Sequence, residues 1–209
     1  TDDIAEESGL ICGGQMDVYI EPLESSPHLY LVGAGHVSYH LGRLASTVGF
    51  RVHVIDDRDK FSNKDRFPDA MEVVVDNIPE WLEKASLSPH AYAVILTRGH
   101  THDLDALRAL ATQDLRYLGL IGSKAKVTRL HEVLSEEGIT IEHPDRLHAP
   151  VGLDIGAISP EEIAVSILAE LIAVKYGKLE SAEGTMDSGV KALRWVPPVK
   201  RTTPVAADS

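Results

Sequence analysis

One glycine turn constrains the fold of this chain more than any other feature. An apolar strand at 29–32 runs into a turn that holds Gly33 and Gly35, and a helical pattern follows. A second apolar strand at 51–55 ends at Asp56. The interval from Gly33 to Asp56 is close to the roughly 20 residues that separate glycines from acid in a dinucleotide-binding βαβ unit. The segment therefore predicts a turn whose backbone amides, with the helix N-terminus, can bind a phosphate.

The rest of the chain continues as alternating strands and helices. Further strands are expected at 71–75, 92–97, 117–121 and 146–149, and further helices at 79–85, 103–111, 124–137 and 160–176. Residues 57–70 are expected to form a polar loop. The last helix has the clearest start, because Ser159, Pro160 and Glu162 supply an N-cap, a favoured first residue and a capping box. Apolar strands that alternate with helices indicate an α/β, Rossmann-like, doubly wound parallel sheet covered on both faces.

Two shorter parts flank this Rossmann-like domain, which we place at residues 27–177. Residues 1–26 contain a glycine-rich loop around Cys12 and an alternating segment, 16–22, that predicts a short β-strand. Residues 178–209 show little periodicity, and we expect an extended C-terminal tail there.

Composition narrows the range of partners and compartments. The net charge of −12 and the lack of a basic stripe argue against nucleic acid and anionic membranes as partners. No apolar run approaches the roughly 20 residues that span a bilayer. The N-terminus lacks signal-peptide features, and one cysteine cannot form an intramolecular disulfide. We therefore expect a cytoplasmic protein.

Residues that directly follow the strands are the candidates for ligand binding, because ligands of such sheets bind at the carboxyl ends of the strands. Gly33, Gly35 and His36 follow the first strand, and Asp56 follows the second. Asp56 could accept a hydrogen bond from a ribose 2′-hydroxyl, which would favour NAD, whereas Arg58 could take the 2′-phosphate of NADP.

The fourth strand is followed by Arg98, His100 and Asp103. In a dehydrogenase, His100 would be a candidate acid or base, and Asp103 would orient it. Asp103 is equally suited to cap the helix that we expect to begin there.

Two further loops carry candidate residues. Gly122, Ser123 and Lys124 form a second small turn that opens a helix, and Lys124 could meet an anion, although Ser123 is also an ordinary N-cap. The apolar, glycine-rich loop at 150–157 holds one carboxylate, Asp154, and either shapes a pocket wall or serves only as a rigid connection. The chemistry of Cys12 alone does not decide between an accessible thiol and a buried one.

Taken together and in this order, the motifs resemble the XdhC/CoxI family of xanthine dehydrogenase accessory proteins. The matching segments are Gly9-Leu-Ile-Cys12-Gly-Gly14, Gly33-Ala-Gly35-His36-Val37, Ile55-Asp56-Asp57-Arg58, Thr97-Arg98-Gly99-His100 with Asp103, Tyr117-Leu-Gly-Leu-Ile-Gly122-Ser123-Lys124, and Ala149-Pro-Val-Gly-Leu-Asp-Ile-Gly-Ala157 leading into Pro160-Glu161-Glu162-Ile163. The ordered set is far more specific than any one glycine motif.

The resemblance implies a non-catalytic chaperone for the molybdenum cofactor, molybdopterin. Such proteins work with a cysteine desulfurase that adds the terminal sulfido ligand, and pass the cofactor to a molybdenum hydroxylase of the xanthine or carbon monoxide dehydrogenase type. The family cysteine important for cofactor binding matches Cys12, and a thiolate suits a soft metal–sulfur centre such as molybdenum. The resemblance also implies that residues 1–26 are the remnant of a larger N-terminal domain. We further expect a homodimer.

The cofactor-binding residues predicted from the strand ends and the resemblance are Cys12, Gly33, Gly35, His36, Asp56, Arg98, His100, Gly122, Ser123, Lys124 and Asp154. Two alternatives remain open from the residues themselves. One is an NAD(P)-dependent oxidoreductase with His100 and Asp103 as catalytic residues, and the other is a nucleotide-binding regulatory module.

Overall fold

A computed structural model describes residues 26–179, apart from the side chain of His100. Cys12, the predicted strand at 16–22 and the predicted tail beyond residue 179 lie outside this part. Six parallel strands form one sheet: β1 (His28–Val32), β2 (Arg51–Asp56), β3 (Glu72–Val75), β4 (Tyr92–Ile95), β5 (Tyr117–Leu120) and β6 (Leu147–His148). All six match predicted strands, although β6 is shorter than the predicted 146–149.

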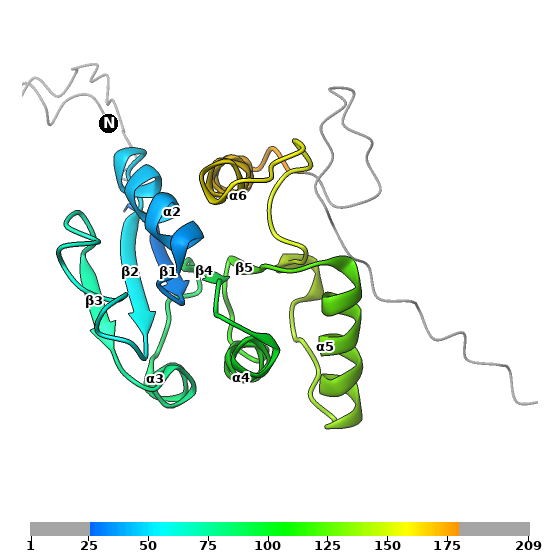
Figure 1. Ribbon diagram of the computed structural model, residues 1–209. Coiled ribbons are helices and arrows are strands. Elements are labelled where there is room, and N and C mark those ends of the chain that lie inside the picture. The colour runs from blue at the N-terminus through cyan, green and yellow to red at the C-terminus, as the bar shows by residue number, and fades with distance from the viewer. Residues whose placement is uncertain (1–25, 180–209) are drawn as a thin grey trace, which may run out of the picture.

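The five α-helices of the described residues cover the two faces of this sheet (Figure 1). They are α2 (His36–Thr47) and α6 (Pro160–Lys175) on one face, and α3 (Ile78–Lys84), α4 (His100–Leu110) and α5 (Lys124–Glu136) on the other. A short 3₁₀ helix, η1 (Pro144–Arg146), precedes β6. Burial on both faces explains the nearly continuous apolar sequences of β1, β2 and β4.

The strand order β3-β2-β1-β4-β5-β6 confirms the predicted doubly wound fold. After β3 the chain crosses back over β1 to form β4, so the connections leaving β1 and β4 run to opposite faces of the sheet. In sheets of this type the crevice at such a switch point is the usual ligand site. The glycine turn that follows β1 lies at this position.

The β2–β3 connection is the predicted polar loop, and one aromatic side chain fixes it to the domain. Phe67 is only 2% exposed and packs on α2. A Cβ atom placed on Gly42 of α2 would lie 3.2 Å from Phe67 Cδ1, so the absence of a side chain at Gly42 lets the ring approach. The loop is thereby held beside the glycine turn, where its polar residues can contribute to a site.

The ends of the helices follow local sequence signals, with one correction. Ser159 Oγ accepts from the Glu162 amide at 3.2 Å and Glu162 Oε2 accepts from the Ser159 amide at 3.0 Å, which confirms the predicted capping box of α6. The prediction that Asp103 caps its helix was wrong. Helix α4 begins at His100 with Gly99 as its N-cap, because the backbone already turns into the helix after Gly99, and Asp103 lies in the first turn.

A buried polar cluster joins α6 to the sheet. Glu170 is 1% exposed, and its Oε1 accepts from Tyr117 Oη at 2.6 Å and lies 2.8 Å from His148 Nδ1. The Tyr117 and His148 rings stack at 4.3 Å. Burial, followed by the neighbouring Glu170, raises the pKa of Tyr117 well above its ordinary value, so the hydroxyl stays protonated and donates.

Replacing Tyr117 by phenylalanine tests this cluster. The change leaves the buried carboxylate of Glu170 without its hydroxyl donor, and we expect the free energy of unfolding to fall by about 1–3 kcal/mol in urea denaturation. The matched control is Tyr176→Phe, which removes an exposed hydroxyl and is expected to change stability by less than about 0.5 kcal/mol. Equal effects in the two variants would contradict a structural role for the cluster.

Candidate functional site

The glycine turn between β1 and α2 is shaped by a close approach of two backbone segments. Gly33 has a φ of +104°, and a Cβ atom there would lie 2.6 Å from the carbonyl oxygen of Leu96, just after β4. Ser38 occupies the place where dinucleotide-binding turns carry a third small residue. Its buried hydroxyl donates to the Gly33 carbonyl at 2.5 Å, so the extra polar atom is satisfied within the turn.

The N-terminus of α2 has room and donors for an anion. Gly35 is its N-cap, no side chain caps its first amides, and its first turn contains no acidic residue. A Cβ atom on Gly35 would meet only the Leu96 carbonyl, at 4.0 Å, within the described part of the chain. His36 follows and is exposed. Free amide groups and the helix dipole favour a negatively charged group at this position.

Asp56 lies beside this turn, but its carboxylate is already engaged. Oδ2 accepts from the Ala34 amide at 2.7 Å and from Arg58 Nη2 at 2.9 Å, while Oδ1 accepts from Arg58 Nε at 2.7 Å and from the Arg58 amide at 3.0 Å. The residue is 1% exposed. Asp56 therefore builds the turn, and in this arrangement it does not offer a free carboxylate to a ribose hydroxyl.

The contacts of Asp56 also lower the pKa of its carboxyl group. Burial by itself would raise the pKa of Asp56, but the hydrogen bonds from the Arg58 side chain and the Ala34 amide outweigh it and hold the pKa below the ordinary value of 3.8. Asp56 consequently remains charged at neutral pH, and the pair formed with Arg58 is neutral overall.

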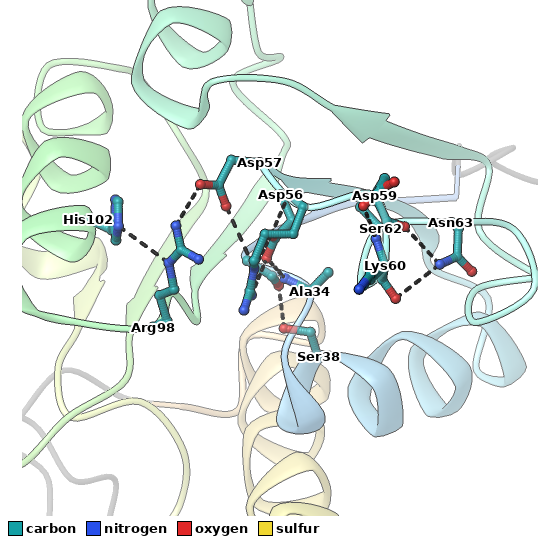
Figure 2. A network of polar contacts seen from close by, with 12 residues as sticks. Ala34, Ser38, Asp56, Asp57, Asp59, Lys60, Ser62, Asn63, Arg98 and His102 are labelled. Atoms are coloured by element: carbon teal, nitrogen blue, oxygen red, sulfur yellow. Dashed lines mark hydrogen bonds and ion pairs between the residues drawn. The ribbon is translucent and has the colours of Figure 1, made fainter.

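An ion pair links the ends of β2 and β4 across the switch point. Arg98 Nη2 lies 2.7 Å from Asp57 Oδ2, and Arg98 Nε lies 3.4 Å from His102 Nε2 on α4. Figure 2 shows Asp57, Arg98 and His102 to one side of Ala34 and Ser38, with the start of the β2–β3 loop to the other. Asp57 and Arg98 keep 38% and 46% of their side-chain surface, so a ligand can reach them.

A second, buried ion pair ties the turn after β4 to the turn after β5. Asp103 is fully buried; its Oδ1 accepts from Thr97 Oγ1 at 2.7 Å and its Oδ2 pairs with Lys126 Nζ. Lys126 crosses Gly122, where a Cβ atom would lie 2.6 Å from Lys126 Cδ. Sequence reasoning missed Lys126, because nothing in the sequence distinguishes it from the exposed Lys124 two residues earlier.

The remaining predicted residues lie further from the turn or are not fully described. Ser123 is the N-cap of α5, with Oγ accepting from the Lys126 amide at 3.3 Å, and Lys124 is the exposed first residue of that helix. His100 begins α4, and its side chain lies outside the description. Asp154 is exposed in the loop that leads to α6. Nothing described brings Asp154 to the glycine turn.

Residues 26–179 contain neither a metal cluster nor a membrane span. In this part of the chain, no three His, Cys, Asp or Glu side chains come together as ligands for a metal ion. None of the helices described is long and apolar enough to cross a membrane.

Comparison with known proteins identifies the family. A family model described as the XdhC Rossmann domain matches residues 29–171. The chain belongs to the XdhC family. Its match covers the sheet from the second residue of β1 onward, both ion-paired turns and most of α6.

Two curated relatives and one solved structure resemble this XdhC domain. The uncharacterized protein YqeB of Escherichia coli is 37% identical over 172 residues, which is 82% of this chain and 31% of YqeB. A protein of Bacillus subtilis described as a probable xanthine dehydrogenase subunit is 36% identical over 160 residues, or 76% of this chain and 46% of that protein. A crystal structure from Bacillus halodurans described as a xanthine dehydrogenase is 38% identical, with a TM-score of 0.65 over 73% of this chain and 45% of that one. The chain thus spans less than half the length of these relatives.

Alanine substitutions at Gly33 and Gly49 separate two reasons for a glycine at position 33: the close approach of the Leu96 backbone and the positive φ. Gly49 also has a positive φ, +88°, but a Cβ atom there meets nothing within 4 Å. We expect Gly49→Ala to cost about 1–2 kcal/mol of unfolding free energy. Gly33→Ala should cost at least about 2 kcal/mol more, because the Leu96 backbone has to move. Similar losses in urea denaturation would show that the β1–β4 approach tolerates a side chain.

Replacing Arg58 by methionine should make stability depend on pH in a specific direction. Without the guanidinium, burial, which is the largest single influence on this carboxyl, is opposed only by backbone hydrogen bonds, and we expect the pKa of Asp56 to rise above its unfolded value. Relative to wild type, we expect a loss of about 1.5–3 kcal/mol at pH 7, where the buried carboxylate is charged. The loss should shrink as pH falls through the raised pKa towards 3.8, the ordinary pKa at which half of the carboxyl groups are protonated in the unfolded chain as well.

The control for this pH series is Arg129→Met. Arg129 is a 65% exposed arginine on α5 that pairs only with exposed Glu132 among the described residues. It is expected to lose less than about 1 kcal/mol at any pH in the series. A loss in Arg58→Met that stays constant with pH would contradict the assignment of Asp56 as a charged, buried partner.

Proposed function

We propose that this XdhC domain binds the molybdenum cofactor and assists its sulfuration and its insertion into a xanthine dehydrogenase-type molybdenum hydroxylase. The observation that carries the proposal is the start of α2, where the first amides have no side-chain cap and Gly35 leaves the approach open, in a chain of the XdhC family. The names of the Bacillus relatives associate proteins of this kind with xanthine dehydrogenase. In this proposal a cysteine desulfurase is a second partner, and the domain itself is not a catalyst.

The residues around the turn fit the phosphate end of that cofactor. Gly35 leaves its face open, and the first turn of α2 has no carboxylate to repel an anion. Arg98 is half exposed beside the turn and can exchange its partner Asp57 for a phosphate oxygen. An exposed pair of this kind contributes only about 0–1 kcal/mol, so exchanging its partner costs little. The bound cofactor would supply the metal–sulfur centre needed by the client enzyme.

Cys12 remains the predicted thiolate ligand at the molybdenum end. Cys12 lies outside the described residues, and the proposal requires it to lie close enough to the glycine turn for one cofactor molecule to reach both. A carrier that binds the phosphate by backbone amides and the metal by one soft ligand can release both ends of the cofactor, because hydrogen bonds and a single coordination bond are reversible.

The oxidoreductase alternative receives less support from the described contacts. It needed Asp103 to orient His100, but both carboxylate oxygens of Asp103 are taken, by Thr97 and by Lys126. Its NAD-dependent form also needed the carboxylate of Asp56 for ribose, and that carboxylate is buried. The proposed accessory role does not require a free carboxylate at Asp103 or Asp56.

Replacing Gly35 by aspartate tests the phosphate end directly. The backbone angles at Gly35, φ −68° and ψ −168°, suit any residue, and a carboxylate there would cap α2 and occupy its free amides. We expect stability to stay constant or rise by about 0.5–2 kcal/mol. Affinity for molybdopterin, measured by equilibrium titration, should fall at least tenfold.

Two further variants locate the contacts. Gly35→Ala adds a methyl group without charge or cap and should bind within a few-fold of wild type. Cys12→Ala should weaken binding of the molybdenum-loaded cofactor but not of metal-free molybdopterin. If wild type fails to bind either form, or if Gly35→Asp binds as well as wild type, the glycine turn is not the cofactor site.

A further inference from the structure

Arg66, in the β2–β3 loop, is a cation without a carboxylate partner. Its Nη2 lies 3.4 Å from the Ala34 carbonyl oxygen, in the glycine turn, and its Nε is buried without an acceptor. Among residues 26–179 no acid pairs with it. Buried arginine nitrogens are nearly always hydrogen-bonded in folded proteins, so an arginine with an unpaired Nε and no acid partner stands out beside the turn.

A second guanidinium lies close to the first. The centre of the Arg58 guanidinium is 3.9 Å from the centroid of the Phe61 ring, and that of Arg66 is 5.3 Å from the same centroid. Arg66 also lies 5.1 Å from the Tyr39 ring of α2. These rings hold both cations in place by cation–π contact, which lowers the entropy that a ligand would otherwise have to remove.

The charges around Phe61 leave a positive surplus. Asp56 neutralises Arg58 through Nε and Nη2, and Asp57, which also pairs with Arg98, lies 3.7 Å from Arg58 Nε. Arg58 Nη1 still has no acceptor among the described residues, and 26% of the side chain is exposed. Arg66 adds a full charge. Two like charges near one ring repel each other, and an anion that contacts both removes that cost. The surplus is local, because the chain as a whole carries −12.

The position of this pair in the fold indicates what it binds. In Rossmann folds the residues after β2 face the ribose of a dinucleotide, where a carboxylate selects the free 2′-hydroxyl and an arginine selects a 2′-phosphate. Here the Asp56 carboxylate is already hydrogen-bonded to Ala34 and Arg58, and two guanidinium groups lie beside the turn.

We propose that Arg58 and Arg66 form a subsite for a phosphate monoester, so that the glycine turn prefers a 2′-phosphorylated dinucleotide such as NADPH over NADH. The subsite rests on the proposed ligand site at Gly33–Ser38 but not on the identity of the carried cofactor. The terminal phosphate of molybdopterin offers the same chemistry, and the test below separates these two sources.

The experiment compares NADPH, NADH and molybdopterin by titration on wild type, Arg66→Gln and Lys60→Gln. Lys60 is an exposed residue of the same loop, so its variant makes the same change in charge without removing a guanidinium. We expect NADPH to bind wild type at least tenfold more tightly than NADH, because only NADPH has the monoester. Arg66→Gln should remove most of that preference, and Lys60→Gln should keep it. Thermal unfolding of both variants checks that the fold is intact.

Each outcome decides between the two proposals. Equal binding of NADPH and NADH, with molybdopterin indifferent to Arg66→Gln, overturns the subsite and leaves the cofactor proposal standing. NADPH preference without any molybdopterin binding supports the subsite and overturns the cofactor proposal. If molybdopterin binds and is weakened tenfold by Arg66→Gln while neither dinucleotide binds, the subsite holds the phosphate of the pterin.

If Arg66→Gln unfolds, Arg66→Lys answers the same question. Lysine keeps the charge but loses the planar, two-pronged donor set of arginine. An intermediate affinity for the preferred phosphate ligand supports the subsite, and an unchanged affinity contradicts direct contact.

Discussion

The hydrogen bond from the Ala34 amide to the Asp56 carboxylate fixes the geometry on which the rest of this site depends. It holds the glycine turn against the end of β2 with a charged acceptor that is almost completely buried. A buried carboxylate is stable only when its lone pairs are satisfied, and this requirement recruits Arg58. Arg58 in turn lies over Phe61, which borders Arg66, while the neighbouring Asp57 reaches Arg98 on the far side of the switch point. The two acids at the end of β2 thereby hold Arg58 and Arg98 beside the turn.

This arrangement is the local basis on which the proposed anion site would act in an acidic chain. Charges separated by more than about 8 Å are largely screened at physiological salt, so the net charge of −12 acts weakly on a bound group. What counts is the local set: free amides on α2, Arg66 without an acid, and Arg98 held by an exposed partner. The acids nearest the turn, Asp56 and Asp57, are each paired with an arginine, and their repulsion of a phosphate is correspondingly reduced.

The fold could be predicted from the sequence because its signals are local. Glycines at Gly33 and Gly35, apolar runs of strand length and the capping box before α6 each report on a few neighbouring residues, and each was confirmed. The site was less predictable because its contacts join residues far apart in the chain. Asp56 was recognised at the correct spacing, but the sequence does not show that Arg58 and Ala34 occupy it. The pairing of Lys126 with Asp103, and the approach of Arg66 to Ala34, depend on how separate loops pack.

The acid at the end of β2 therefore has to be interpreted by its contacts and not by its spacing alone. The interval from the glycines fits an NAD-binding unit, and the chain folds as that unit does. Because the Asp56 carboxylate is engaged in the turn, the selectivity of the proposed ligand site would depend on the side chains that the β2–β3 loop places beside the turn. In this chain the loop has no helix of its own between residues 57 and 71, and Phe67 anchors it to α2 through the gap at Gly42. That anchor brings Arg66 to the turn, so the packing of one aromatic ring determines which charge a ligand meets.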